Sequence, residues 1–536
     1  METPLNFACS PPTIAAALAA AAATHGHRRA YIDDGQLHSF RGTDDNAGAL
    51  AARLAAAGIA RGDRIAVIVP NQIEWLQVFF AAAKLGTVIV GLSVRYRDTE
   101  LDYMLSDSKA SMVISLAEYA GYDYRRYFSA AKAEGRLPDV RQVVYLAPRA
   151  GHALAPFAAL GEAAAPVPMA EAVAEPDDLM MIIYTSGTTG KPKAAGLTHR
   201  SMLASASAQA RHIRAAPDDL IQLANPLNHV GGITCGILTF LLAGATCELV
   251  PVFKAEIVLE MAARRPPTVI SGVPTMLTLL LRHPKVGEAD FSSVRLVFMG
   301  GANVDGAILE RLQQVMPGAR LMNLYGMTES SGAIVMTPWE CGQDDLLQSI
   351  GQPLAGAQLR VVGTDGQPAP EGSVGELWFK GLGVIPGYAG AQHREEAFDS
   401  DGWLHSGDLA CVDQRGFVFL KGRDKDMYIQ GGFNVYPVEV EGVIASHPAV
   451  MLVAGVGVPD PVLGQIGRYY IVQKEGCTVT EQDLIEYCRA RLADYKVPKQ
   501  VLFREQLPMT PVGKIQKAAL RSEQLASVAK FNGSQA

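Results

Sequence analysis

The chain has 536 residues and a formal net charge of −7 at pH 7, from 47 basic and 54 acidic side chains. This length exceeds what one hydrophobic core supports, so we expect a large domain and a smaller one. The acidic balance argues against a nucleic-acid-binding protein, which normally presents a basic face. The seven cysteines are scattered without metal-ligand spacing, which is typical of reduced thiols in a cytoplasmic protein.

The N-terminal part alternates between short apolar runs and helical patterns. We predict a helix over 15–23, strands over 65–69, 88–90 and 112–116, and a helix over 75–85. The acidic Glu2 precedes the first of these without a basic segment, which argues against a secretory signal. Alternation of this kind favours mostly parallel sheets covered by helices. The Ala-, Pro- and Gly-rich stretch 148–178 predicts a mobile connection.

Residues 184–193 place five hydroxyls, two glycines and two lysines within ten residues. Glycines can turn backbone N–H groups toward an anion, hydroxyls donate, and lysines supply countercharge, so this loop predicts phosphate binding. It follows an apolar run over 179–184 and precedes a helical pattern over 198–211, which is where open α/β sheets bind ligands. It is not a Walker A loop, because Pro192 stands where that motif needs Ser or Thr.

The rest of the chain predicts one buried helix and two antiparallel regions. The apolar run 231–245 is too short to span a membrane, so we interpret it as a buried helix. Strands over 359–362 and 374–379 predict a small barrel-like subdomain. After Lys425 the pattern restarts as a small α+β domain. Its predicted elements are a helix over 438–445, strands over 451–458 and 469–473, and a helix over 481–492.

The phosphate loop resembles that of the adenylate-forming superfamily, which includes acyl-CoA synthetases, peptide-synthetase adenylation modules and beetle luciferases. Further segments resemble the family's motifs in the family's order: 323–329 the adenine and magnesium motif, 403–409 the ribose segment, 422–426 the domain hinge, and 508–517 the catalytic-lysine loop. The resemblance covers nearly the whole chain. It implies an α/β N-terminal adenylation domain over 1–424 and a mobile C-terminal domain over 425–536, hinged at Lys425.

The resemblance also implies a reaction in two steps. A carboxylate attacks the α-phosphorus of ATP, pyrophosphate leaves, and the thiol of coenzyme A then displaces AMP. Thr328 would reach the α-phosphate, Glu329 with Thr185 would hold Mg²⁺, and Lys514 would neutralise charge during attack. The residues implied to bind ATP are Thr185, Ser186, Gly187, Thr188, Thr189, Gly190, Lys193, Gly301, Ala302, Asn323, Tyr325, Asp408, Arg423 and Lys514.

Within that set, each nucleotide group has an expected partner. Tyr325 would offer an aromatic face to adenine, Gly301 and Ala302 the opposite wall, and Asn323 an amide for the exocyclic amine. Asp408 would accept both ribose hydroxyls, with Arg423 nearby. Gly431, Gly432 and Phe433 would line the passage for the pantetheine arm of coenzyme A.

The implied acyl pocket suggests an acid larger than acetate. Its predicted residues are His229, Gly231, Gly232, Gly300, Gly326 and Met327. Acetate-specific relatives carry Trp where this chain has Gly326, so glycine favours medium-chain, alicyclic or aromatic acids. We interpret His229 as a gate and not a base. Asn228 replaces an aromatic residue found in many coenzyme A ligases, which leaves the shape of the pocket mouth open.

Three alternatives remain at this stage. Amino-acid or carrier-loading adenylation is disfavoured because no Asp lies between Asn225 and Val250 to meet a substrate ammonium. A luciferase-like monooxygenase needs only a different substrate on the same scaffold. A non-catalytic binding protein conflicts with retention of Lys514, Glu329 and the complete phosphate loop. The sequence leaves open which acid is used, and whether the protein is a monomer or a homodimer.

Overall fold

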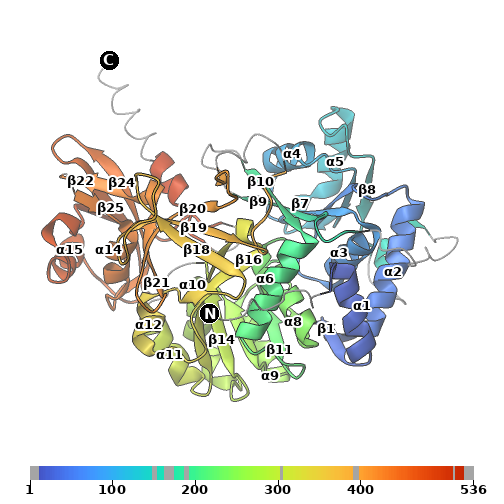
Figure 1. The fold of residues 1–536 in the computed structure, drawn as a ribbon, viewed down its shortest axis with the longest axis horizontal. Coiled ribbons are helices and arrows are strands. Elements are labelled where there is room, and N and C mark those ends of the chain that lie inside the picture. Colours follow the sequence, from blue (N-terminus) through green and yellow to red (C-terminus); the bar gives the residue numbers. More distant parts are fainter. Residues whose placement is uncertain are drawn as a thin grey trace.

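The computed structural model describes residues 11–147, 154–161, 174–185, 192–301, 306–389, 397–431, 433–510 and 514–523. Several predicted site residues lie outside these ranges: Ser186, Gly187, Thr188, Thr189, Gly190, Ala302 and Gly432. The described chain forms a large N-terminal α/β part and a smaller C-terminal part, which occupy opposite ends of the molecule (Figure 1).

A six-stranded sheet is built from the first predicted βα units. Its strand order is β10-β9-β4-β3-β5-β8, and all neighbours are parallel except β9 and β10. The strands are β3 (Arg64–Ile68), β4 (Val88–Gly91), β5 (Met112–Ser115), β8 (Gln142–Tyr145), β9 (Leu179–Thr185) and β10 (Lys193–Thr198). Every residue of β4 and β5 is buried, as expected for parallel strands covered on both faces.

A nine-stranded sheet follows the order β17-β16-β15-β14-β13-β11-β12-β1-β2. Its strands are β1 (Arg29–Asp33), β2 (Gln36–Ser39), β11 (Leu220–Leu223), β12 (Thr246–Leu249), β13 (Val269–Gly272), β14 (Leu296–Gly300), β15 (Arg320–Met327), β16 (Gly332–Met336) and β17 (Gln352–Pro353). From β15 to β1 the strands are parallel, so the carboxyl ends of β11, β13, β14 and β15 meet at one edge. That edge is where open α/β sheets bind ligands.

Helices cover both sheets, and one hydrophobic core joins them. They are α1 (Ile14–His25), α2 (Phe40–Ala56), α3 (Ile73–Leu85), α4 (Asp98–Asp107), α5 (Tyr124–Ala133), α6 (His199–His212), α9 (Ala255–Arg264), α10 (Pro274–Arg282), α11 (Gly306–Val315) and α12 (Gln343–Gln348). Every residue of α3 is buried, and its aromatic side chains pack with residues of both sheets in that core. The helix predicted over 75–85 is therefore confirmed.

The apolar run 231–245 forms a continuous buried helical segment of three parts. These are α7 (Val230–Gly232), a π-helical turn η3 (Ile233–Leu238) and α8 (Thr239–Ala243). The prediction of a buried helix is confirmed, although hydrophobicity alone did not indicate the π turn. Among the described helices, none combines the length and apolarity needed to span a membrane.

An antiparallel sheet leads toward the C-terminal part. Its strands β18 (Ala357–Val362), β19 (Gly375–Gly381), β20 (Leu404–Val412) and β21 (Val418–Arg423) pair in chain order. The predicted pairing of 359–362 with 374–379 is confirmed, since Leu359 lies opposite Phe379. Between β21 and the next sheet lies the short turn Asp424–Asp426, around the predicted hinge Lys425.

The C-terminal part has its own sheet and its own hydrophobic clusters. The elements are β22 (Tyr428–Gln430), β23 (Phe433–Val435), α14 (Pro437–Ala445), β24 (Val450–Asp460), β25 (Gly464–Gln473), α15 (Glu481–Arg489) and β26 (Gln500–Phe503). The predicted small α+β domain is confirmed, with its second helix ending at Arg489 rather than at Leu492. The short strands β22, β23 and β26 were not predicted.

Candidate active site

A cavity of about 640 Å³, including its open mouth, lies at the carboxyl edge of the nine-stranded sheet. Residues that follow or end four parallel strands line it: Asn225, Gly272, Val273, Gly300, Gly301, Leu324 and Gly326. Val230, Gly231 and Cys235 of the buried helical segment close one side, and Met276 of α10 another. Most of this lining is apolar, which suits a hydrocarbon portion of a ligand.

Lys514 reaches this cavity from the C-terminal part of the chain. Its backbone N–H donates to Thr510 Oγ1 at 3.0 Å, and a β-bridge between Met509 and Ile515 closes the loop. Burial lowers the pKa of Lys514 below its ordinary 10.5, and the Arg423 guanidinium lowers it further, while Asp408 and Glu329 act in the opposite direction. A partly desolvated cation thus stands at the mouth of an apolar cavity.

Glu329 is a buried carboxylate that carries two hydroxyl donors. The Tyr388 hydroxyl donates to Glu329 Oε1 at 2.7 Å, and Thr185 Oγ1 donates to the same oxygen at 3.4 Å. The Lys193 ammonium lies 5.6 Å from the centre of the Tyr388 ring. Thr185, Lys193 and Glu329, predicted to act together, therefore lie together, and Tyr388 joins them.

This arrangement fits Mg²⁺. Within the described ranges, no three His, Cys, Asp or Glu side chains gather as a closed metal centre. Mg²⁺ commonly takes one or two protein oxygens and completes its shell with water and substrate phosphates. Glu329, with the Thr185 hydroxyl beside it, supplies that minimal oxygen set.

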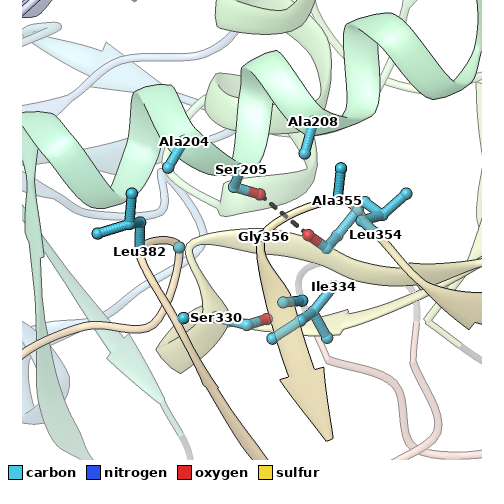
Figure 2. A pocket seen from close by; sticks show the side chains of 13 residues that line it. Ala204, Ser205, Ala208, Ser330, Ile334, Leu354, Ala355, Gly356 and Leu382 are labelled. Atoms are coloured by element: carbon cyan, nitrogen blue, oxygen red, sulfur yellow. Dashed lines mark hydrogen bonds between the residues drawn. The ribbon is translucent and has the colours of Figure 1, made fainter. Parts of the chain in front are cut away.

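The turn that carries Thr328 and Glu329 is fastened to α6. Ser331 adopts a positive φ of 54°, and its hydroxyl donates to Ser201 Oγ at 2.8 Å. One turn later on α6, the Ser205 hydroxyl donates to the carbonyl oxygen of Ala333 at 3.1 Å (Figure 2). These two bonds fix the start of β16 and hence the turn before it.

A second cavity, of about 340 Å³, lies beside this attachment. Figure 2 shows Ala204, Ser205 and Ala208 of α6 facing Ile334 and Leu354 across it. Its lining is made of small and apolar residues without charged side chains. It is separate from the cavity that Lys514 enters, since the two share no lining residue.

Asp408 is bound from both sides by predicted nucleotide-site residues. The Tyr325 hydroxyl donates to Asp408 Oδ2 at 2.5 Å, and Arg423 Nε donates to Oδ1 at 3.0 Å. Burial and the neighbouring Asp408 raise the pKa of Tyr325 well above its ordinary value, so the phenol stays protonated and keeps donating. The Tyr325 ring also packs against Phe379, with centroids 5.8 Å apart.

Asn323 has one satisfied and one unsatisfied end. Its Nδ2 donates to the carbonyl oxygens of Leu346 at 2.5 Å and Ser349 at 3.1 Å. Its Oδ1 is buried and finds no hydrogen-bond partner within the described ranges. Because an unpaired buried acceptor is costly, this oxygen suits a ligand N–H such as the exocyclic amine of adenine.

His229 lies in the cavity as a neutral side chain. Its Nδ1 accepts the backbone N–H of Gly231 at 3.1 Å. Burial lowers the pKa of His229 to about 3, and the charge of Lys514 adds to this effect. A group with so low a pKa stays uncharged at neutral pH, which agrees with a wall residue rather than a base.

The predicted acyl-pocket residues divide into two groups. His229, Gly231, Gly300 and Gly326 line the cavity, whereas Gly232 and Met327 are not among its lining residues. Gly232 instead serves packing, because a Cβ there would lie 2.1 Å from the carbonyl oxygen of Pro226.

Gly326 is also required by strand pairing. A Cβ at Gly326 would lie 1.9 Å from the carbonyl oxygen of Gly332, at the irregular step of the β15–β16 ladder. Backbone atoms cannot yield as a flexible side chain does, so a side chain here would displace β16. The pairing of β15 with β16 therefore requires glycine at position 326, whatever the size of the acid.

Three further predicted positions lie in places the motifs did not specify. Gly301, expected as a wall for adenine, lines the cavity and has Lys514 beside it. Asn228 lies outside the cavity lining, with its Cα against Gly91. Phe433 is 56 % exposed and stacks on Tyr495 at 4.6 Å, away from the cavity lining.

The motifs do not include Tyr388, Phe379, Gly272, Met276 or Phe298, whereas Asn225 begins the segment 225–232 that resembles the family's acyl-pocket segment. None of the first five positions belongs to a motif with characteristic spacing. The usable signal is positional for Gly272, which ends a short apolar run that predicts a strand of the parallel sheet. The local sequence does not specify the order of the strands in that sheet, and this order determines which strand ends lie side by side.

A sequence model described as AMP-binding enzyme matches residues 18–389, and one described as AMP-binding enzyme C-terminal domain matches residues 439–514. The chain belongs to the AMP-binding enzyme family. The first match contains Thr185, Lys193, His229, Gly301, Asn323, Tyr325, Glu329 and Tyr388, whereas Asp408 and Arg423 lie between the two matches. Lys514 is the last residue of the second match.

Known members of the AMP-binding enzyme family resemble the whole chain. It is 34% identical over 525 residues to 3-[(3aS,4S,7aS)-7a-methyl-1,5-dioxo-octahydro-1H-inden-4-yl]propanoyl:CoA ligase of Rhodococcus jostii, covering 96% of this chain and 99% of that protein. It is 36% identical over 473 residues to a feruloyl-CoA synthase of an Amycolatopsis species, covering 88% and 91%. The ATP-bound crystal structure of MatB from Rhodopseudomonas palustris matches with a TM-score of 0.84 at 30% identity, covering 95% and 98%.

Proposed function

We propose that this AMP-binding enzyme is an acid–thiol ligase that joins a carboxylic acid to coenzyme A and converts ATP to AMP and pyrophosphate. The observation that carries the proposal is the position of Lys514. Lys514 lines the apolar cavity, and Asp408 and Glu329 raise its pKa against the lowering effects of burial and Arg423, which supports a role between the acid and the nucleotide. A cation at this position would offset the negative charge that accumulates when a carboxylate attacks a phosphate.

In the first half-reaction the acid's hydrocarbon portion occupies the cavity and its carboxylate faces Lys514. Attack on the α-phosphorus forms the bond between a carboxylate oxygen and phosphorus, and breaks the bond to pyrophosphate. Lys514 offsets the negative charge that the two anions bring together. Thr328, 6 % exposed beside Glu329, is the proposed hydroxyl contact for the α-phosphate.

The nucleotide is held by fixed groups on two sheets. Asp408 on β20 would receive the ribose hydroxyls, with Tyr325 of β15 already bonded to it, and Asn323 Oδ1 would accept from adenine. Glu329, oriented by Tyr388, would hold Mg²⁺, which would neutralise the departing pyrophosphate when bound.

In the second half-reaction a thiol attacks the acyl carbon and AMP leaves. We infer that the C-terminal domain turns about Lys425 for this step and presents Gly431, Gly432 and Phe433 to the pantetheine arm. The turn at Asp424–Asp426 between two separate sheets, and the exposed stack of Phe433 on Tyr495, support this inference.

We infer that the acid is alicyclic, aromatic or medium-chain. The apolar lining of the cavity suits a ring or a hydrocarbon chain, and two relatives described above are named for ring-containing acyl groups. An amino acid is disfavoured because no Asp or Glu is among the residues that line the cavity. The six described cysteines are free thiols, which supports a cytoplasmic location.

The proposal is tested by pyrophosphate release over a panel of carboxylic acids, with and without coenzyme A and with product nucleotides identified. We expect AMP and pyrophosphate with ring-containing or medium-chain acids, and acyl-CoA when coenzyme A is present. Formation of ADP and phosphate would overturn the proposal. Pyrophosphate release with amino acids alone would favour the adenylation-module alternative.

A further inference from the structure

Asn225 is a wall residue of the acyl cavity whose side chain has one buried oxygen that is unpaired within the described part of the chain. It follows β11 and is among the residues that line the cavity. Its Oδ1 is buried and finds no hydrogen-bond partner among the residues that the structure describes. Leaving such an acceptor unpaired is costly, so its retention in a largely apolar wall calls for a ligand that pairs with it.

The backbone of Asn225 is fixed, which keeps its side chain in the wall. Asn71, itself 5 % exposed, donates through Nδ2 to the carbonyl oxygen of Asn225 at 2.9 Å. The Asn71 Oδ1 accepts the backbone N–H of Leu227, also at 2.9 Å. One amide thus clamps both ends of the turn around Pro226.

The other polar groups of the cavity already have roles. His229 uses Nδ1 to accept the Gly231 N–H, and its ring is neutral. Burial raises the pKa of Cys235 to about 12, so its thiol stays protonated and is only a weak donor. Lys514 faces the reacting carboxylate. The neutral hydrogen-bonding groups left for the body of the acyl chain are the Nε2–H of His229, which only donates, and the Asn225 side chain, whose Oδ1 is an acceptor.

Sheet order sets the distance of this group from the reaction centre. Lys514 lies against Gly301, which follows β14, and a Cβ at Gly301 would also lie 3.4 Å from Val273, which follows β13. β11 is the next strand beyond β13. Neighbouring strands are about 4.8 Å apart, so Asn225 lies roughly one to two strand spacings, about 5–10 Å, from the carboxylate position.

We propose that Asn225 is a specificity-determining residue that hydrogen-bonds a hydroxyl group on the acyl body, several bonds from the carboxylate. This inference rests on the proposed function and names its substrate class as oxygen-substituted ring or chain acids. The hydroxyl donates to Oδ1 and can accept from Nδ2, so it satisfies the amide that the apolar wall leaves bare. An acid without the hydroxyl would leave Asn225 unpaired.

The test compares matched acids on the full-length enzyme by initial rates of AMP formation. The pairs are phenylpropanoic acid and its para-hydroxy analogue, cyclohexylacetic acid and its para-hydroxy analogue, and octanoic acid and a terminally hydroxylated octanoic acid. We expect the wild type to favour the hydroxylated member of at least one pair by about tenfold or more in kcat/KM.

Asn225→Leu should reduce that ratio by about tenfold to a hundredfold, mainly by slowing the hydroxylated acid. Asn225→Ala, which adds no bulk, should reduce it in the same direction. Gln313→Leu is the control, because it makes a comparable amide-to-leucine change at an exposed position of α11, outside the cavity lining. It should leave the ratio as in the wild type.

The outcomes separate this inference from the proposed function. If the wild type forms AMP but favours no hydroxylated acid, or if both Asn225 variants keep the wild-type ratio, the role of Asn225 is wrong and the ligase function stands. If no acid in the wider panel supports AMP formation, the ligase function is wrong, and the Asn225 assignment fails with it.

Discussion

The Lys514 side chain lies directly against the backbone of Gly301, so that a Cβ at Gly301 would be 2.9 Å from Lys514 Cε. Gly301 has a φ of +84°, a conformation that glycine adopts without strain. Lys514 of the C-terminal part thus occupies space that any side chain at position 301 of the N-terminal part would fill. The proposed first half-reaction requires a contact of this kind between Lys514 and the wall of the cavity.

Lys514→Ala should slow adenylation about 10²–10³-fold, the scale of losing one charge-stabilising group. Thioester formation from purified acyl-adenylate should continue, because that step does not require a cation at the attacking carboxylate. Pyrophosphate exchange measures the first step and thioester release the second. Lys499→Ala removes an exposed lysine of the same domain and serves as the control. Equal loss of both half-reactions would contradict the assignment.

Gly432→Leu should have the opposite effect, because a leucine in the proposed pantetheine passage blocks the thiol and leaves the nucleotide site intact. Adenylate should accumulate on the enzyme while coenzyme A fails to discharge it. Gly432 lies outside the described residues, so this expectation comes from its place in the motif. If adenylation falls as steeply as thioester formation, the passage is not at Gly432 and the hinge at Lys425 loses its support.

The basic limb of the pH profile should belong to Lys514. Its pKa is lowered below 10.5, and the charged form is the active one, so kcat/KM for ATP should fall as pH rises through that lowered pKa. In Lys514→Arg the fall in activity should move to higher pH, because a guanidinium keeps its charge there. The maximal rate of this variant should be lower than that of the wild type. Pyrophosphate exchange from neutral to alkaline pH measures both. An unchanged limb in Lys514→Arg would assign it to another group.

Glu329→Gln should lower adenylation about hundredfold and increase the Mg²⁺ concentration required, because the amide keeps the shape but removes the charge that holds the cation. Tyr388→Phe keeps the carboxylate and removes only a hydroxyl that orients it, so it should cost about tenfold. Rates titrated with Mg²⁺ distinguish the two. Identical Mg²⁺ dependence in the wild type and Glu329→Gln would place the metal elsewhere.

Cavity size is better tested at Gly272 than at Gly326. A Cβ at Gly272 meets only ordinary contacts, the nearest being Met276 Cβ at 3.5 Å, whereas one at Gly326 collides with backbone. Gly272→Leu should lower kcat/KM for phenylpropanoic acid about hundredfold and spare propanoic acid, because the new side chain fills acyl space. Gly287→Ala, at a position with open space around it, controls for folding. An unchanged ranking of acids would remove Gly272 from the acyl site.

Local patterns predicted much of this fold because its parallel strands are short, continuous apolar runs. The run 179–184 became β9 and the run 112–116 became β5, within a residue or two at each end. Helix ends were less predictable. The helix expected to reach Leu492 ends at Arg489, where helical geometry gives way to a turn. The π turn over Ile233–Leu238 has no distinct hydrophobic period and could not be predicted.

At the site, the motifs predict several residues that lie close together in the structure. They do not predict the residues that surround and orient them. The motifs predict Thr185 and Glu329 as partners, and the Thr185 hydroxyl lies 3.4 Å from Glu329 Oε1. Tyr388, which donates to the same carboxylate from 59 residues away, has no spacing rule that could reveal it. The sequence predicts that Gly326 enlarges the acyl pocket. In the structure a Cβ at Gly326 would collide with the backbone of Gly332, beside β16. This collision depends on the register of β15 and β16, which the local sequence does not specify.

Asn71 connects the two large sheets next to the acyl cavity, so we expect it to affect which acids the enzyme accepts. Asn71 precedes α3, after β3 of the six-stranded sheet, while the turn it holds follows β11 of the nine-stranded sheet. The turn that carries Asn225 is therefore held in place by a residue outside the cavity lining. A substitution of Asn71, which is not among the residues that line the cavity, should therefore change which acids are accepted, because it frees the turn that carries Asn225.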